Sequence, residues 1–462
     1  MKKILTTLLW IPLLFTACYK KSDLNIDGKT TDERLKEALR KYNEILVSAP
    51  YGWIMTEYTT GSAINGGVTQ TGPKAIFTYY MKFEKDNKVS MLSDFAPGMA
   101  NTFNTSSFDI KATQRPTLVF DTYSYVHVPC DPDGNINNSP FSGGYGFGWG
   151  ADFEFGFEQN PDELGDTIRL KGNLNSTTVT LIRATKEEQD IFNASGFSAM
   201  INWNKILTYF KQFNYNGITF QLSPGIAGKS LNVKYTGHPE ILNVRHQFVA
   251  DKLIFTTPLP AGNSSIQSLT ITGFNSNNQT ISAKVNGTTD ITISGARRPY
   301  LPDLTAATRF FNGGLNNPWV STAGLHVAGV DDAYNIRSLT YGAGAFFAFV
   351  YYPQVVRGGG NTWFDVLSPV LTGLDDSYPY LYNNGVVQTY IQGNLIGFFP
   401  LDLDGPSGQP SLDQTNDVLA SGTIPPEPGK NYGFYVVPLE DGKTFDIVDA
   451  GTATAWMNWR HL

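Results

Sequence analysis

Residues 152–158 read Asp152-Phe153-Glu154-Phe155-Gly156-Phe157-Glu158, so phenyl rings alternate with acidic residues and one glycine. Side chains along a β-strand point alternately to opposite faces of the sheet. The stretch therefore predicts a strand that buries its rings in a core and leaves its carboxylates in solvent. The same period of two predicts hairpins over 75–92 and 168–183 and a longer strand over 117–128.

The composition also favours sheet over helix. Only 16% of the 462 residues are charged and 13% are aromatic, and Gly, Tyr and Phe are frequent. Aromatic residues fit pleated, half-buried surfaces, whereas charged helix formers are scarce here. The sequence therefore predicts a mainly β protein, with antiparallel sheets that form sandwiches or open, barrel-like modules.

Two helical segments interrupt this pattern. Thr30 and Glu33 form a Ser/Thr-x-x-Glu capping box, which opens an amphipathic helix that ends before Pro50. The apolar face of this helix consists of Leu35, Leu39, Tyr42, Ile45 and Leu46. A second capping box, Thr185 with Glu188, opens a helical segment over 186–212.

These signals divide the chain into five parts. They are a signal peptide (1–17), a tether (18–29), an N-terminal β-rich domain with a leading helix (30–185), a second β-rich module opened by helices (186–300) and a C-terminal β-rich domain (301–462). The segments 168–172 and 269–273 share the pattern apolar-x-apolar-x-Gly followed by a turn. This echo indicates either a duplicated β module or the strand–turn pattern that unrelated hairpins commonly share.

The N-terminus predicts export and lipid anchoring. Lys2 and Lys3 precede an apolar run over 4–15, which is too short to span a bilayer, and small residues then lead to Cys18. We expect a lipid on Cys18 that holds the protein at the outer membrane, on its periplasmic or cell-surface face. The alternative is an ordinary cleaved signal peptide. The residues after Cys18 lack an acidic run, which leaves the face of the membrane open.

The charge and the cysteine count exclude several classes of function. The formal net charge of −7 argues against nucleic acid as a partner, because phosphate binding needs a basic face. If Cys18 carries lipid, Cys130 is the one remaining cysteine, and an intramolecular disulfide is impossible. We interpret Cys130 as a small buried apolar residue, with a nucleophile as the alternative. The five histidines form no zinc-binding spacing, and we expect no cofactor.

A Gly-rich stretch over 141–150 carries the main candidates for ligand binding. Tyr145, Phe147 and Trp149 alternate with glycines there, and flat aromatic faces on loops commonly stack on sugar rings. The alternative is that these rings fill a core.

His127 is a further candidate, since the predicted strand over 117–128 places it on one face with Tyr123 and Tyr125. It is either ligand-facing or a hydrogen-bonded structural histidine. Asp131, Asp133 and Asn135 are spaced two apart, as in a calcium loop, but a plain Asp-Gly turn explains the same residues.

Several segments together resemble a family of uncharacterised Bacteroidota lipoproteins that is defined by a domain of unknown function. The resemblance rests on Glu33-Arg34-Leu35 through Gly52-Trp53, on Leu118-Val119-Phe120-Asp121-Thr122-Tyr123 with His127, on Asp152-Phe153-Glu154-Phe155 and on Ile168-x-Leu170-Lys171-Gly172. It implies a setting beside outer-membrane uptake systems that pair a TonB-dependent transporter with a surface lipoprotein, and it implies no activity.

These observations together predict a cell-envelope lipoprotein that is not an enzyme. We expect it to act as a binding or accessory component linked to an outer-membrane nutrient-uptake system. Its partners would be the membrane, through the lipid, a transporter complex and a glycan or peptide ligand. The alternatives are a secreted glycan or peptide hydrolase and a purely structural envelope protein.

Overall fold

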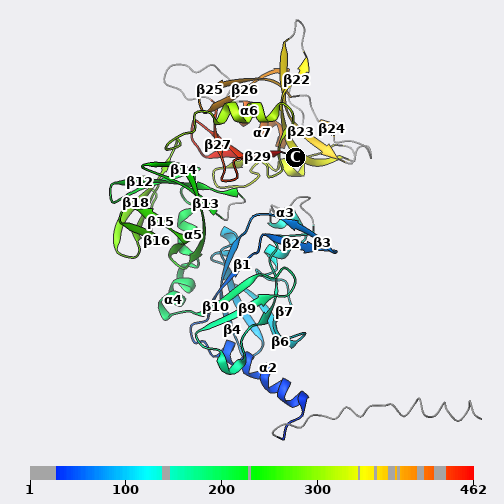
Figure 1. Ribbon diagram of the computed structural model, residues 1–462, viewed down its shortest axis with the longest axis vertical. Helices are drawn as coiled ribbons and strands as arrows, with labels where there is room; N and C mark the ends of the chain where they lie inside the picture. Colours follow the sequence, from blue (N-terminus) through cyan, green and yellow to red (C-terminus); the bar gives the residue numbers. More distant parts are fainter. Residues whose placement is uncertain are drawn as a thin grey trace, which may run out of the picture.

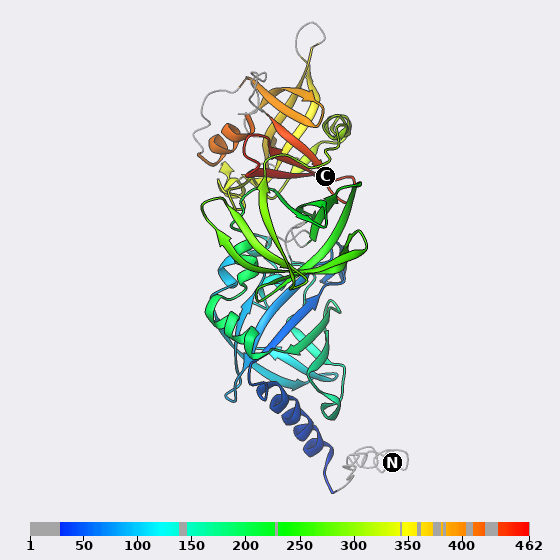
Figure 2. The same ribbon diagram turned by 90° about the vertical axis from the view of Figure 1, so that its left-hand side faces the viewer.

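The computed structural model describes residues 28–137, 146–226, 230–341, 344–357, 362–372, 380–381, 385–402, 410–420 and 433–461. Strands dominate it and all the sheets are antiparallel, so the prediction of a mainly β fold is confirmed. Three β-rich units follow one another along the long axis of the molecule (Figures 1 and 2). No helix among these residues is both long enough and apolar enough to cross a membrane.

The first unit is a closed barrel of eight strands, which we call the first barrel. Its strands are β1 (Trp53–Tyr58), β4 (Ile76–Phe83), β5 (Lys88–Ser93), β6 (Asn104–Ala112), β7 (Pro116–Phe120), β8 (Glu154–Phe157), β9 (Thr167–Gly172) and β10 (Thr178–Arg183). Consecutive strands pair, and β1 closes the ring by pairing with both β4 and β10. A hairpin of β2 (Ser62–Asn65) and β3 (Val68–Thr71) lies outside the ring. The hairpins predicted over 75–92 and 168–183 are confirmed.

Helix α2 (Thr31–Val47) precedes the first barrel and begins with the predicted capping box, which is confirmed. Its apolar face is fixed to the barrel by Tyr42 and Leu46, both buried. The Tyr42 ring lies 4.2 Å from that of Phe157, and the Trp53 indole donates a 2.8 Å hydrogen bond to the Leu46 carbonyl. The helix thus continues the barrel core at the end of β8.

The second unit, the second barrel, is another closed ring of eight strands. It comprises β11 (Phe210–Tyr215), β12 (Ile218–Pro224), β13 (Ser230–Tyr235), β14 (His238–Val249), β15 (Lys252–Ala261), β16 (Ser264–Asn275), β17 (Thr280–Val285) and β18 (Thr289–Ala296). The helices before it are α4 (Lys186–Ser195), which has the predicted capping box, and α5 (Ser198–Trp203). The predicted helical segment is too long at its end, because Phe210 already begins a strand.

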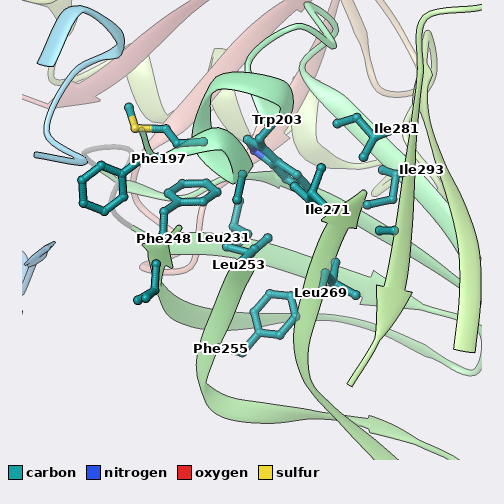
Figure 3. Close-up of a cluster of buried hydrophobic side chains, with 14 of the residues drawn as sticks. Phe197, Trp203, Leu231, Phe248, Leu253, Phe255, Leu269, Ile271, Ile281 and Ile293 are labelled. Atoms are coloured by element: carbon teal, nitrogen blue, oxygen red, sulfur yellow. The ribbon is translucent and has the colours of Figure 1, made fainter. Parts of the chain in front are cut away.

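Helix α5 contributes side chains to the core of the second barrel. Figure 3 shows Trp203 beside Ile271 within the same cluster of buried apolar side chains as Leu253. The cluster continues to the outer wall of the first barrel, where the Tyr80 ring stacks on that of Phe192 at 4.4 Å. The two barrels therefore share one apolar interface through α4 and α5.

The third unit, the third module, is an 11-stranded sheet. Because β22 pairs with both β19 and β23, eight of its strands form a closed circuit. These are β19 (Trp319–Ser321), β22 (Gly344–Arg357), β23 (Trp363–Thr372), β25 (Val386–Gln392), β26 (Leu395–Asp402), β27 (Phe434–Pro438), β28 (Phe445–Asp449) and β29 (Ala455–His461). The short strands β20 (His326–Val327), β21 (Thr340–Tyr341) and β24 (Tyr380–Leu381) lie outside the circuit.

Two helices accompany the third module, α6 (Ala306–Gly314) and α7 (Pro410–Ala420). Phe310 of α6 stacks on Trp319 and Tyr351 at 4.9 and 5.5 Å between ring centroids, inside the core. At the boundary with the second barrel, the buried Tyr209 hydroxyl donates a 2.7 Å hydrogen bond to Asp446.

One plan therefore occurs three times along the chain, a helical segment followed by a meander of eight strands. The sequence echo does not mark equivalent places in it. The segment 168–172 is the seventh strand of the first barrel, whereas 269–273 lies in the sixth strand of the second. The repetition lies in the strand order, and the similar sequence pattern reflects the strand–turn–strand arrangement common to many hairpins.

Candidate ligand-binding site

Three stacked rings lie on the loops at one end of the first barrel, and we call them the ring ladder. The His127 imidazole lies between Tyr123 and Phe153, with centroid distances of 5.6 and 4.9 Å and interplanar angles of 25° and 29°. Tyr123 is 59% exposed and Phe153 is 37% exposed. The two outer rings therefore remain accessible to solvent while the middle ring joins them.

The chain reaches this arrangement because β7 ends at Phe120. The strand predicted over 117–128 is wrong beyond that point, where a turn donates the His127 N–H to the Ser124 carbonyl at 2.9 Å. Tyr125 does not share the face of the ladder. Its half-buried ring contacts the barrel core, and its hydroxyl donates to the Thr102 carbonyl at 2.9 Å.

Hydrogen bonds fix the His127 ring in one tautomer. Its Nδ1 accepts from the Ser124 N–H at 3.1 Å, so the ring proton resides on Nε2. Burial lowers the pKa of His127, and a hydrogen bond with the backbone of Phe120 opposes that shift only in part. His127 is therefore a neutral spacer between two exposed rings, and both of its nitrogens have protein partners.

Tyr123 is held from its polar end. Its hydroxyl donates a 2.5 Å hydrogen bond to Asp131 Oδ2, while Asp131 Oδ1 accepts the Asp133 N–H at 2.9 Å. Partial burial and this bond to a carboxylate raise the pKa of Tyr123. Asp131 lies in a tight turn and, through this hydrogen bond, fixes the orientation of the Tyr123 ring.

The calcium candidates lie in this same turn. Asn135 belongs to the short helix α3 (Gly134–Asn137), and its side chain lies outside the described residues. Among the residues that the structure describes, no three His, Cys, Asp or Glu side chains gather as a metal site.

Phe153 points outward because the preceding residue points inward. Asp152 is buried and accepts hydrogen bonds from the backbone N–H groups of Leu174, Asn175 and Thr177 at 2.8 to 3.1 Å. The prediction of a solvent-facing Asp152 and a buried Phe153 is therefore wrong, although Phe155 and Phe157 are buried as expected. The strand begins only at Glu154, so the period of two does not extend to these two residues.

A second carboxyl group lies beneath Asp152. Glu57 on β1 is fully buried, and its Oε1 accepts the Asp152 N–H at 2.7 Å. Burial raises the pKa of Glu57 to about 8, and the nearby Asp152 charge adds to the effect. Although the two carboxyls are adjacent, both are less than 4% exposed, so a substrate does not reach them from solvent.

Of the two interpretations of the Gly-rich stretch, the one in which the rings fill a core holds for Trp149. Trp149 is buried at 4% exposure, its Nε1 donates to the Asn137 carbonyl at 2.8 Å, and its ring meets Phe77 edge-on at 5.8 Å. Gly148 and Gly150 have φ values of 52° and 62°, where a Cβ would lie 2.5 Å from backbone oxygens of neighbouring loops. The glycines therefore permit the tight approach that drives Trp149 inward.

The other sequence candidates have separate outcomes. Phe147 is half-buried, while Tyr145 and Cys18 lie outside the described residues. The Cys130 thiol lies under the loop, with Sγ 3.5 Å from the Val126 carbonyl oxygen, and burial holds its pKa well above the usual value. That environment disfavours a thiolate nucleophile.

The ring ladder presents apolar ring faces to solvent. The adjacent carboxyl groups of Glu57 and Asp152 are buried, so they do not form an acid–base pair that a substrate can reach. Sequence reasoning missed Phe153 as a site residue, since the alternating pattern assigned it to the core. The only sequence signal for its position is the short turn at 172–177, whose backbone needs an acceptor that Asp152 supplies.

Comparison with known proteins gives one family. The family described as "Domain of unknown function (DUF4302)" matches residues 26–273, which include the whole first barrel and most of the second. No curated protein matches the chain.

Solved structures give only remote similarities. The DNA polymerase III β subunit of Thermotoga maritima has 9% identity, with 92% of this chain and 97% of that chain covered, and a TM-score of 0.14. The C. crescentus β sliding clamp has 10% identity, with 93% of this chain and 96% of that chain covered, and a TM-score of 0.17. Transferrin binding protein B of Neisseria meningitidis has 10% identity, with 89% of this chain and 76% of that chain covered, and a TM-score of 0.15. Scores this low carry no argument about fold or function.

Proposed function

The chain belongs to the DUF4302 family, and from that premise we propose that it is a lipid-anchored cell-envelope protein that binds a glycan without turning it over. The anchor is the lipid expected on Cys18, followed by a short tether to α2. The protein then acts as a capture or accessory component of an outer-membrane nutrient-uptake system, as the family resemblance implies.

The ring ladder carries this proposal. Pyranose rings have apolar faces of C–H groups that stack on flat aromatic side chains, and Tyr123 and Phe153 each leave ring surface in solvent. Two of its rings are held by hydrogen bonds, since the Ser124 N–H donates to His127 Nδ1 and the Tyr123 hydroxyl donates to Asp131. Rings held in this way lose little conformational entropy when a ligand binds.

The position of the ladder supports capture away from the membrane. Helix α2, which follows the tether, contacts the far end of β8, where the Tyr42 hydroxyl donates to the Gln159 carbonyl at 2.8 Å. Phe153 precedes β8 and so lies at its opposite end. Leu174 and Ile136, 57% and 52% exposed, add apolar surface on the loops at that end.

A hydrolase is the second candidate, and the carboxyl pair of Glu57 and Asp152 is the observation that would favour it. Glycosidases need two carboxyl groups that flank the scissile bond. Here the carboxyl pair is buried and occupied with backbone groups, which favours binding over hydrolysis.

The test is a glycan screen of the full-length protein in detergent, followed by affinity measurements on the double variant Tyr123→Ala/Phe153→Ala. We expect binding to weaken about tenfold or more, because each stacked ring contributes on the order of 1 kcal/mol. Phe103→Ala is the matched control, since Phe103 is an aromatic residue of the first barrel with 42% exposure outside the ladder.

Two results would contradict the proposal. One is an affinity of the double variant equal to that of the wild type. The other is cleavage of the glycan by the purified wild-type protein with no other protein present. The anchor is tested separately with Cys18→Ala, expressed in cells that are then fractionated. We expect less of this variant than of the wild type in the membrane fraction.

A further inference from the structure

A second exposed aromatic surface lies on strands β25 and β26 of the third module. Strands β25 and β26 alternate, so that Val387, Ile396 and Phe398 enter the core. The residues between them face outward, and Tyr390 and Phe399 are 54% and 39% exposed. We call Tyr390, Phe399 and the Gly397 backbone between them the outer platform.

The strand register places these rings together. Tyr390 is paired with Gly397, and Phe399 is paired with Gln388, so the two rings are diagonal neighbours on one face. Diagonal neighbours lie ~7–8 Å apart, which is within reach of aromatic side chains. Since Gly397 has no side chain, the Tyr390 ring has no side chain directly across from it. The two rings can therefore contact adjacent units of one extended ligand.

The surroundings of the outer platform are poor in charge. The sequence over 344–402 has no Lys or Glu, and its charged residues are Arg357, Asp365, Asp375, Asp376 and Asp402. Asp365 is buried, where its carboxylate accepts the backbone N–H groups of Gln354 and Thr389. An exposed sheet face ordinarily carries mixed charges, so this composition is unusual for a surface that faces only water.

The polar groups beside the rings are amides. Gln388 and Gln392 are exposed on the same face of β25 as Tyr390. Amide side chains both donate and accept hydrogen bonds, which suits hydroxyl groups. A phosphorylated or acidic ligand would instead need lysine or arginine, and the platform strands between Val386 and Leu401 contain neither.

We propose that the outer platform is a second binding site, specific for an uncharged oligosaccharide. The C–H faces of two neighbouring sugar rings stack on Tyr390 and Phe399, and their hydroxyls bond to the amides of Gln388 and Gln392. The site is distinct from the ring ladder and lies in the part of the chain beyond the family match.

A bilayer fits this surface less well. Helix α2, which the expected lipid tether joins, and strands β25 and β26 lie at opposite ends of the long axis of the molecule (Figures 1 and 2). A membrane that holds the anchored end is therefore not the surface nearest to the platform.

The inference rests on the proposed glycan binding and adds a prediction about chain length. Two sites on one protein retain a polymer that reaches both more tightly than either site alone, because the second contact is intramolecular. We therefore expect long neutral glycans to be retained more strongly than short ones.

The test uses full-length protein in detergent on a panel of neutral and acidic polysaccharides. We expect Tyr390→Ala/Phe399→Ala to reduce retention of a neutral polysaccharide about tenfold and to leave the thermal transition unchanged. Phe347→Ala is the matched control, since Phe347 is an aromatic residue of the same module with 41% exposure. Gln388→Ala is expected to have a smaller effect in the same direction.

The outcomes separate the two sites. Retention that Tyr123→Ala/Phe153→Ala lowers and Tyr390→Ala/Phe399→Ala leaves unchanged overturns the second site and supports the ring ladder. An absence of glycan binding by the wild type overturns both. A platform variant that loses only liposome binding or self-association, measured by flotation and sedimentation, reassigns the surface to a membrane or to a second copy.

Discussion

The first and second barrels have the same strand order, but different elements fill their ends. In the second barrel, helix α5 carries Met200 and Trp203 into an apolar core. In the first barrel, a loop carries Trp149 into the core at the end away from α2. Beneath that loop lie two buried carboxyl groups, Glu57 and Asp152.

Backbone hydrogen bonding explains this difference. Part of the α5 backbone is satisfied within the helix, and its Ala199 N–H donates to the Ala250 carbonyl at 3.0 Å, so α5 enters the core without buried carboxyl groups. A loop lacks helical hydrogen bonds, and a buried N–H without an acceptor is costly. Asp152 and Glu57 are those acceptors, since they receive backbone N–H groups of the loop and of the turn at 172–177. Closing a barrel with a loop therefore required buried carboxyls.

The largest expected effect is the loss of either tryptophan. Trp149→Ala and Trp203→Ala each remove a buried indole, which typically costs about 3–5 kcal/mol of unfolding free energy. Because the chain has three units, unfolding is best followed by amide hydrogen exchange of each barrel separately. We expect Trp149→Ala to lower protection mainly in β4 and its neighbour β1, since the indole meets Phe77 there, and Trp203→Ala mainly in β14 to β16.

Phe103→Ala is the control, as a partly exposed ring of the first barrel. Equal loss of protection in both barrels after either substitution would show that they unfold as one unit, against the separate closures described above.

An effect of comparable size is a pH dependence of the first barrel. The pKa of Glu57 is raised from 4.5 to about 8 by burial, so the folded state binds a proton that the unfolded state has released. The free energy of unfolding should therefore fall as pH rises from about 4.5 to about 8, by on the order of 5 kcal/mol. Glu57→Gln should remove this slope and make the first barrel relatively more stable above pH 8.

The measurement is protection of β1 and β10 amides at pH 5, 7 and 9, after correction for intrinsic exchange rates. Asp446, in β28 of the third module, has a pKa raised to about 6 by burial, so the stability of the third module should fall in the same direction over a lower pH range. A Glu57→Gln protein whose first barrel keeps the wild-type slope would mean that another group titrates.

The smallest expected effect is on stability at the ring ladder. Tyr123→Ala and Phe153→Ala remove exposed rings, so each should change the unfolding free energy by only about 0.5 kcal/mol. Thermal unfolding by circular dichroism measures this directly. A large loss of stability would instead identify the ladder as part of the barrel closure and weaken its assignment to binding.

Local patterns predicted the local elements well. The capping boxes at Thr30 and Thr185 and the hairpins over 75–92 and 168–183 follow from interactions between residues close in sequence. The predictions failed at the end of β7, where the strand stops at Phe120, and at Asp152 and Phe153, which precede β8. The alternation in 152–158 suggested a buried Phe153, and the alternation of glycine and aromatics left open whether Trp149 is exposed or buried.

The sequence alone determined the β-rich class, the leading helix and the two capping boxes, because hydrophobic period and capping are local properties. The tertiary structure decided which rings face solvent. Asp152 points inward because the N–H groups of the turn at 172–177 need an acceptor, and Trp149 enters the core because Gly148 and Gly150 let the chain pack closely against the backbone at Pro129 and Ser62. Those contacts join segments that no single stretch of sequence describes, so only the folded chain distinguishes a buried ring from a binding surface.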